Sequence, residues 1–442
     1  MSLTNPGHVV TEQRLAEFYQ QIYPYLGGGG GTGSSATIYG FRISNLESNP
    51  SEKIIYLADA VGMTPAHMDF TNDVFDYGSW ENAFFMPKPC MLKYDGTVDY
   101  YLDPNDYTKK LDGTASDVAN DSYEGNAMME WPKIWLKIVP DTAQNNKSVI
   151  IYISDQNVDG TYTDWPFHNS DGESVDHFYT GIYNGCLISN KLRSISGKQS
   201  LSISNAQQAL GYAESNNPTG SLIWTYSVIA DRQLINFLLF LMFKTTNLQL
   251  ALGEGLSGGD GTTTDIVNTF RTGVHNSKGL FYGTNSASSS TSNNAVKVFG
   301  MENWWGFMYT IYLGELSVNG IRKYKFTYNK EDSSGVVGYN FTGDGYLNFN
   351  LLSEIQAGKY ITEMQFNSYG MFPSNTNDSS SSSTYYCDAF WLPTTSTTGV
   401  RASIWGGSVA YPGKSGPLCT NIFNPIDGLG TVNIVLAAKP LS

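Results

Sequence analysis

Val298-Phe-Gly-Met-Glu-Asn-Trp-Trp-Gly306 is the most telling segment of the chain, and Arg401-Ala-Ser-Ile-Trp-Gly-Gly407 repeats its composition. Both segments combine indole rings with glycines and one or two polar residues. Neither contains a catalytic motif, a metal-binding cluster or a phosphate-binding loop. Such a composition is typical of a rigid, buried scaffold beneath a variable surface, which favours a binding protein over an enzyme. We expect the scaffold residues to be Trp304, Trp305, Arg401, Trp405, Gly406 and Gly407.

The composition predicts a β-rich, loop-rich protein with a large core. The 442 residues suffice for one elaborated domain with appendages. Aromatic residues make up 14% of the chain and charged residues 15%, the reverse of what a disordered chain needs. The 45 glycines point the same way, because tight turns and close backbone contacts require glycine.

Charge and hydropathy exclude two classes of partner. The net charge of −14 and the lack of long basic runs argue against nucleic acid, which is bound through clustered Lys and Arg. The first residues show no signal peptide, because no charged segment precedes an apolar one. The longest apolar run, Leu234–Phe243, is too short to span a bilayer, so we expect no membrane insertion.

The chain divides into three parts by pattern. Residues 1–35 hold a predicted helix, Thr11–Leu26, and a glycine-rich linker. The apolar stripe of this helix predicts packing on copies of itself or on a partner, as an attachment or oligomerisation element; a frayed tail is the alternative. Residues 36–165 read as a β-rich part, with strands at 51–57, 133–139 and 148–154.

Residues 166–442 combine two predicted core helices with short β segments. The first helix covers 204–215 with Ser204 as its N-cap, and the second covers 225–245. The second is apolar nearly all round, so it should be buried in the core. The serine run Ser379–Ser383 is expected to be a mobile loop tip.

The motifs that carry chemistry are weak. Gly253-Glu-Gly-Leu-Ser-Gly258 has the letters of a dinucleotide-binding motif, but it follows a helix instead of a strand. The carboxylates of Asp155–Asp164 are spaced too widely for a calcium loop. No histidines lie at metal-ligand spacing. We therefore expect no catalytic residue, no metal and no cofactor, although a structural cation such as calcium stays open.

The four cysteines, Cys90, Cys186, Cys387 and Cys419, contain no C-x-x-C pair. We expect buried free thiols, since cysteine packs as a small apolar residue. A Cys387–Cys419 disulfide is the alternative.

Several blocks, in order, resemble bacteriophage tail and receptor-binding proteins. The resemblance runs from about Gly125 to the C-terminus and rests on six segments: 124–137, 176–185, 191–197, 225–255, 278–283 and 296–306. The block from Arg401 to Gly416 is similar to the ends of C-type-lectin-fold proteins. These include phage tropism determinants and the variable proteins of diversity-generating retroelements, which share their fold with formylglycine-generating enzymes.

The resemblance implies an α+β, C-type-lectin-like (formylglycine-generating-enzyme-like) domain over 166–442, β-rich with two core helices. It implies a homotrimer at a tail-fibre tip of the virion that contacts other tail proteins and binds a glycan or protein on the bacterial surface. Two departures stand out. The segment Val432-Asn-Ile-Val-Leu-Ala-Ala438 replaces the usual end of the retroelement proteins, and the closely spaced cysteine pair of the formylglycine enzymes is missing.

The residues after Gly407 that lie between the scaffold glycines are the candidate ligand contacts. Tyrosine supplies large contact area at low entropy cost, and Ser and Asn supply adaptable hydrogen bonds. The predicted ligand-binding residues are Ser408, Val409, Tyr411, Lys414, Asn421, Phe423 and Asn424. Two alternatives remain: a structural virion protein, such as a head fibre or baseplate decoration, and a polysaccharide-degrading enzyme whose catalytic residues assemble from distant positions.

Overall fold

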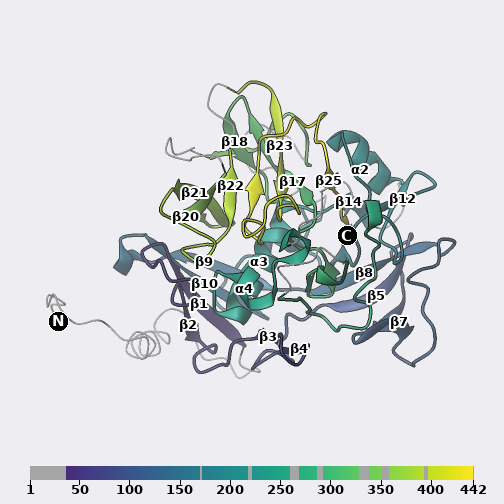
Figure 1. Cartoon of the computed structure of the whole chain (residues 1–442), viewed down its shortest axis with the longest axis horizontal. Helices are drawn as coiled ribbons and strands as arrows, with labels where there is room; N and C mark the ends of the chain where they lie inside the picture. The colour runs from purple at the N-terminus through teal and green to yellow at the C-terminus, as the bar shows by residue number, and fades with distance from the viewer. Residues whose placement is uncertain are drawn as a thin grey trace, which may run out of the picture.

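The computed structural model describes residues 36–169, 172–217, 222–258, 268–285, 292–327, 338–349, 358–392 and 397–441. The expected N-terminal helix and linker (1–35) lie outside these residues. Within the described part, three larger β-sheets surround one buried helix (Figure 1).

The first sheet is built from the N-terminal part of the chain. It has four antiparallel strands in the order β2 (Ile54–Ala58), β1 (Ile38–Ser44), β10 (Ser148–Ser154) and β9 (Trp135–Pro140). The expected strand 148–154 is confirmed, and the other two expected strands begin two or three residues later than predicted. A small hairpin, β3 (His67–Asp69) and β4 (Val74–Asp76), precedes the second sheet in the chain.

The second sheet joins distant parts of the chain. Its seven strands follow the order β14 (Leu222–Tyr226), β26 (Leu436–Pro440), β11 (His177–Gly181), β8 (Gly125–Pro132), β5 (Lys88–Lys93), β6 (Val98–Asp103) and β7 (Asp106–Lys110). The expected domain boundary after residue 165 falls within this sheet. The strand β8 precedes residue 165 and β11 follows it, and the two strands pair directly. The parts 36–165 and 166–442 therefore share one sheet.

The third sheet is built from strands of the C-terminal half of the chain. Its main order is β19 (Leu347–Phe349), β18 (Ile321–Tyr324), β17 (Tyr309–Val318), β23 (Val400–Trp405), β24 (Thr420–Asn421), β22 (Ala389–Trp391), β20 (Lys359–Asn367) and β21 (Gly370–Asn377). A ninth strand, β25 (Val432–Asn433), pairs with β17 in parallel. Two further pairs are β12 (Cys186–Ile188) with β13 (Lys191–Arg193), and β15 (Lys297–Val298) with β16 (Met301–Glu302).

The helix α3 (Ile229–Phe243) is the centre of the core. All of its residues are buried, which confirms the expected buried helix, and it contacts strands of both the first and the third sheet. The helix begins at Ile229 and not at Thr225, because Thr225 and Tyr226 pair with β26 at the end of β14. No helix in the described part is long and apolar enough to cross a membrane.

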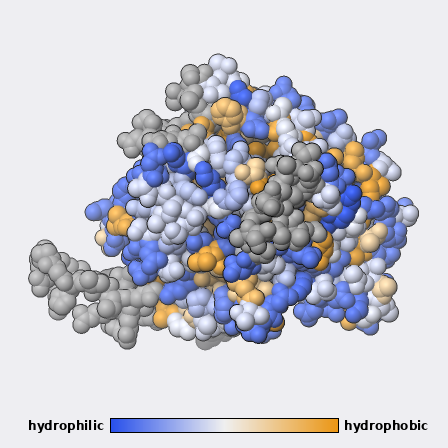
Figure 2. Space-filling model, viewed as in Figure 1, coloured by the Kyte–Doolittle hydropathy of each residue, from blue (hydrophilic) through white to orange (hydrophobic). Residues whose placement is uncertain are grey.

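Two shorter helices complete the helical content. The helix α2 (Ala206–Glu214) lies within the expected range 204–215, but the Asn205 side chain, and not Ser204, caps it by accepting the Gln208 N–H. The helix α4 (Leu248–Leu252) follows α3 closely and is capped by Asn247. The face of the molecule shown in Figure 2 is mainly hydrophilic, with apolar residues in separate groups.

The expectation of an α+β, C-type-lectin-like domain is wrong. The described part is 37% strand and 12% helix and has three α-helices, of which only α3 is long and central. The short blocks that carried the resemblance do not determine sheet topology, because strand pairing depends on residues far apart in the chain. The architecture is a β-rich one, built from sheets around a single core helix.

A buried ion pair joins β17 to β18, two neighbouring strands of the third sheet. Arg322 and Glu315 are both inaccessible to solvent, and Arg322 Nε donates to Glu315 Oε1 over 2.7 Å. The other carboxylate oxygen accepts from Trp405 Nε1 at 2.9 Å and from the Ser403 hydroxyl. The charge of Glu315 therefore holds one of the expected scaffold tryptophans in place.

We predict that Arg322→Met lowers the free energy of unfolding by about 3–5 kcal/mol, because it leaves the Glu315 charge buried without its partner. The matched control is Lys359→Met, which breaks the exposed pair with Asp378 and should cost less than about 1 kcal/mol. Urea titration followed by tryptophan fluorescence measures both. Equal losses for the two variants would contradict this role of the buried pair.

Candidate functional site

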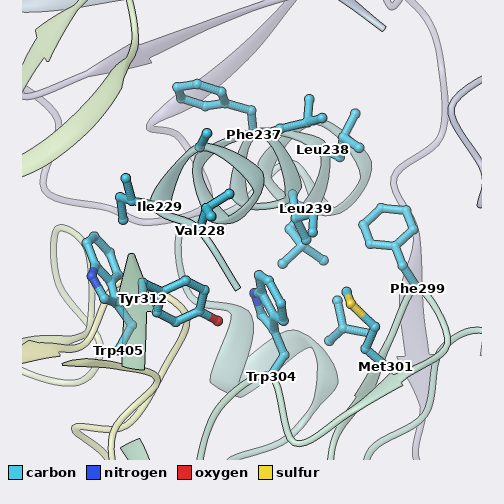
Figure 3. Packing of buried hydrophobic residues seen from close by; sticks show 14 of the residues in the cluster. Val228, Ile229, Phe237, Leu238, Leu239, Phe299, Met301, Trp304, Tyr312 and Trp405 are labelled. Atoms are coloured by element: carbon cyan, nitrogen blue, oxygen red, sulfur yellow. The ribbon is translucent and has the colours of Figure 1, made fainter. Parts of the chain in front are cut away.

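The tryptophan–glycine blocks form the expected buried scaffold. Trp304, Trp305 and Trp405 are 6%, 1% and 0% exposed, so their predicted burial is confirmed. Trp304, Tyr312 and Trp405 lie along the side of α3 (Figure 3). The Trp305 indole N–H donates to the carbonyl of Gly253 over 2.9 Å, which ties the first block to the end of α4.

Arg232 of α3 links these aromatic residues to the C-terminal loop. Its guanidinium carbon lies 4.5 Å from the Trp304 ring, 5.1 Å from Tyr312 and 5.5 Å from Trp405. It donates to the Trp304 carbonyl at 3.3 Å, to the Tyr312 hydroxyl at 2.8 Å and to the Pro417 carbonyl at 2.6 Å. One buried cation thus binds both scaffold and loop.

The two glycines of the second block permit close backbone contact. Gly406 and Gly407 have φ values of +92° and +72°, which L side chains rarely adopt. A Cβ on Gly407 would lie 2.3 Å from the Cβ of Ser415. The Gly306 N–H donates to the Gly406 carbonyl over 2.8 Å and so joins the two blocks.

Arg401 differs from the other scaffold residues because it is only half-buried. Its guanidinium donates to the carbonyls of Phe423 and Thr398, at 3.2 and 3.3 Å. It braces the backbone at the start of β23 and does not belong to the buried scaffold, which corrects that part of the expectation.

Ser408 and Val409 are buried, which corrects the expectation that they contact a ligand. They are 8% and 2% exposed. The Ser408 N–H donates to the Ser415 hydroxyl, and Val409 packs in a small apolar cluster with Phe307 and Met308. The loop closes on itself through these contacts, so the two side chains stabilise its conformation.

The remaining predicted residues lie at the surface. Tyr411 and Phe423 are 41% and 57% exposed, as expected, and Lys414, Asn421 and Asn424 are half-buried. Asn421 Oδ1 accepts the Phe423 N–H, and Asn424 Nδ2 donates to the Leu429 carbonyl at 2.7 Å. Phe423 and Asn424 therefore sit on a hydrogen-bonded turn directly after β24.

Tyr411 and Trp391 form the centre of a surface that we call the aromatic face: Tyr360, Trp391, Tyr411, Lys414 and Asn421. The Tyr411 and Trp391 ring centroids lie 5.0 Å apart, and Trp391 pairs with Asn421 across β22 and β24. Lys414 Nζ donates to the Gly358 carbonyl at 3.1 Å and lies 5.8 Å from the Tyr360 ring. Sequence reasoning did not assign Trp391 or Tyr360 to the site, because only strand pairing places them beside the loop.

A hollow of about 230 Å³ adjoins the aromatic face. Six of its ten lining residues carry an amide or a hydroxyl; the ten are Asn247, Gln249, Leu250, Gly253, Glu254, Thr284, Asn285, Ser382, Ser383 and Gly413. Gly413 connects the two surfaces, because a Cβ placed there would lie 3.6 Å from Ser382 and 3.8 Å from the Tyr360 hydroxyl.

The serine run is held by hydrogen bonds and is not a free loop tip, which corrects that expectation. Asn247 Nδ2 donates to the Ser382 carbonyl at 3.1 Å, while Asn247 Oδ1 accepts the Leu250 N–H and caps α4. The Ser380 hydroxyl donates to the Tyr360 carbonyl at 3.0 Å. The run thereby forms one wall of the hollow.

A buried carboxylate lies behind this hollow. Asp388 is 1% exposed, accepts from Gln249 Nε2 at 2.9 Å and accepts the Leu418 N–H at 2.7 Å. Burial raises the pKa of Asp388 to about 7, although these two hydrogen bonds and the charge of Arg232 lower it. Asp388 thus fixes the end of the loop relative to α4.

The cysteines are free thiols, and the described residues contain no candidate metal site. All four cysteines are buried free thiols, as expected, so Cys387 and Cys419 form no disulfide. Burial raises the pKa of both thiols well above the ordinary range. No group of three or more His, Cys, Asp or Glu residues is placed to hold a metal ion within the described ranges.

Comparison with known proteins adds no relative. No protein-family model and no curated protein matches the chain. The function must therefore be inferred from the geometry of the aromatic face and the hollow.

We predict that Asp388→Asn changes how stability depends on pH. Because the folded-state pKa is raised, the stabilisation from neutral Asp388 is present below its ordinary pKa of about 4 and is lost as the pH rises through about 7. The wild-type free energy of unfolding, measured relative to Asp388→Asn, should fall between pH 4 and pH 8. The exposed control Asp427→Asn should follow the wild type; a pH-independent difference for Asp388→Asn would refute the prediction.

Proposed function

We propose that the protein is a receptor-binding protein of a bacteriophage tail, which attaches to a glycan on the bacterial surface through the aromatic face. The observation that carries the proposal is the exposed Tyr411 ring beside Trp391, next to a hollow lined by amides and hydroxyls. The assignment to a phage tail rests on the ordered blocks that resemble phage receptor-binding proteins.

The chemistry of the aromatic face suits a sugar ligand. Sugar rings present apolar C–H faces that pack on aromatic rings, and hydroxyls that need hydrogen-bond partners at their edges. Tyr411 and Trp391 supply the rings, while Lys414 and Asn421 supply polar groups beside them. Tyrosine and tryptophan lose little side-chain entropy on binding, so they suit a rigid recognition surface.

The buried scaffold supports the proposal because it orders the loop before a ligand arrives. Arg232 holds the Pro417 carbonyl, Asp388 holds the Leu418 N–H, and Ser415 holds Ser408. A pre-ordered loop avoids the entropy cost of ordering on binding, which raises the affinity from a given set of contacts.

A single site of this size binds weakly, so we propose that several linked sites bind together. The proposed assembly is a homotrimer at a tail-fibre tip, attached to other tail proteins through residues 1–35. Three linked sites raise the apparent affinity without any new contact, because the second and third binding events become intramolecular.

We predict that Tyr411→Ala weakens binding to bacterial cells about tenfold, which corresponds to about 1.4 kcal/mol for one aromatic anchor. Flow cytometry with the fluorescently labelled chain on a panel of bacterial strains measures the effect. The matched control is Leu111→Ala, which truncates a side chain that is 67% exposed near β7, far from the aromatic face, and should bind as the wild type does.

Unchanged cell binding by Tyr411→Ala would overturn the proposed binding face. Failure of the wild-type protein to bind any strain, with the fold intact, would favour a structural virion protein without a receptor.

A further inference from the structure

We infer that the hollow beside the aromatic face binds one neutral sugar ring, whose neighbouring hydroxyls donate to the carboxylate of Glu254. This inference rests on the proposed function and names the class of ligand for the same site. It also gives a role to Gly253-Glu-Gly255, the segment whose letters match a dinucleotide-binding motif.

Among the described residues, Glu254 is the only charged one that lines the hollow. No described residue donates a hydrogen bond to its carboxylate or forms an ion pair with it. The amide donors of Asn247 and Gln249 are engaged, with the Ser382 carbonyl and with Asp388. Gln249 Oε1 has no partner among the described residues, but it is buried. The strongest hydrogen-bond acceptor in the hollow is thus available to a ligand.

The scaffold fixes the position of Glu254. Gly253 and Gly255 have φ values of +113° and +71°, so Glu254 lies between two residues whose backbone conformation favours glycine. The Trp305 indole donates to the Gly253 carbonyl, and a Cβ on Gly306 would lie 2.3 Å from the Glu254 carbonyl oxygen. The tryptophan–glycine block therefore holds the Glu254 backbone tightly, which orients the carboxylate in advance of binding.

The size of the hollow limits its occupant to a single ring. Its volume of about 230 Å³ is below the ~300–1,000 Å³ of pockets that enclose drug-sized ligands. Leu250, which is 72% exposed, offers an apolar edge at its rim, and Tyr411 lies on the adjoining face. A longer glycan has room to place one ring in the hollow and the next ring on the aromatic face.

The charge of the hollow selects against acidic sugars. No lysine or arginine of the described part lines it, Glu254 is negative, and the whole chain carries a net charge of −14. A uronic acid or a phosphorylated sugar would place its charge beside Glu254 without compensation. Sugar hydroxyls instead donate to a carboxylate, and such charge-assisted hydrogen bonds are about twice as strong as neutral ones.

The test compares Glu254→Gln with the wild type on an array of immobilised oligosaccharides. The array carries neutral hexose chains, uronic-acid chains and chains with free amino sugars. Glu254→Gln keeps the shape of the side chain but loses the charged acceptor, so binding to neutral hexose chains should fall about 10–100-fold. The exposed control Glu81→Gln makes the same change in net charge and should bind as the wild type does, and thermal melting checks the fold of both variants.

Two results would overturn the inference: wild-type binding by Glu254→Gln, or preference of the wild-type protein for the uronic-acid or amino-sugar chains over the neutral ones. Either result leaves the proposed function standing if Tyr411→Ala still weakens cell binding. The proposed function itself fails if Tyr411→Ala also binds cells normally, so the two failures are distinguishable.

Discussion

Arg232 is the residue on which the C-terminal half of the structure depends. A buried cation is costly unless it finds hydrogen-bond partners and compensating contacts. Arg232 finds them in two carbonyls, one tyrosine hydroxyl and three aromatic rings, which come from four different segments. Those segments are therefore held together around α3, because moving one of them removes a partner from a guanidinium whose Nε already has none among the described residues.

The constraint reaches the surface through a short chain of contacts. Arg232 binds the Pro417 carbonyl, and Asp388 binds the next residue, Leu418. Asp388 is in turn bound by Gln249, which lines the hollow. The loop that carries Tyr411 and Lys414 thus takes its position from the core, and the hollow and the aromatic face are two consequences of the same packing.

Burial was predictable from local sequence, whereas contact between distant segments was not. The apolar run of α3 and the glycines beside Trp304 and Trp405 indicate burial on their own. The predicted start of α3 was wrong because Thr225 and Tyr226 pair with β26, some two hundred residues further along the chain. The α+β lectin-like expectation failed for the same reason, since sheet order depends on pairings that short blocks of similarity do not encode.

The candidate site shows the same limit. Tyr411 and Phe423 were predictable as exposed aromatics between turn residues. Ser408 and Val409 have the same kind of neighbours, yet the hydroxyl of Ser415 and a small apolar cluster bury them. The hollow combines residues from α4, from 284–285, from the serine run and from Gly413, and no periodicity in the sequence links these four places.

The most direct measurement is hydrogen–deuterium exchange on the full chain, with and without the surface polysaccharide extracted from a strain that the protein binds. A binding face built from the C-terminal loop and α4 predicts slower exchange in 247–254, 382–391 and 408–424, and little change in the strands β5 to β7. Slower exchange confined to β5–β7, or none in 408–424 at saturating polysaccharide, would contradict a binding face at this position.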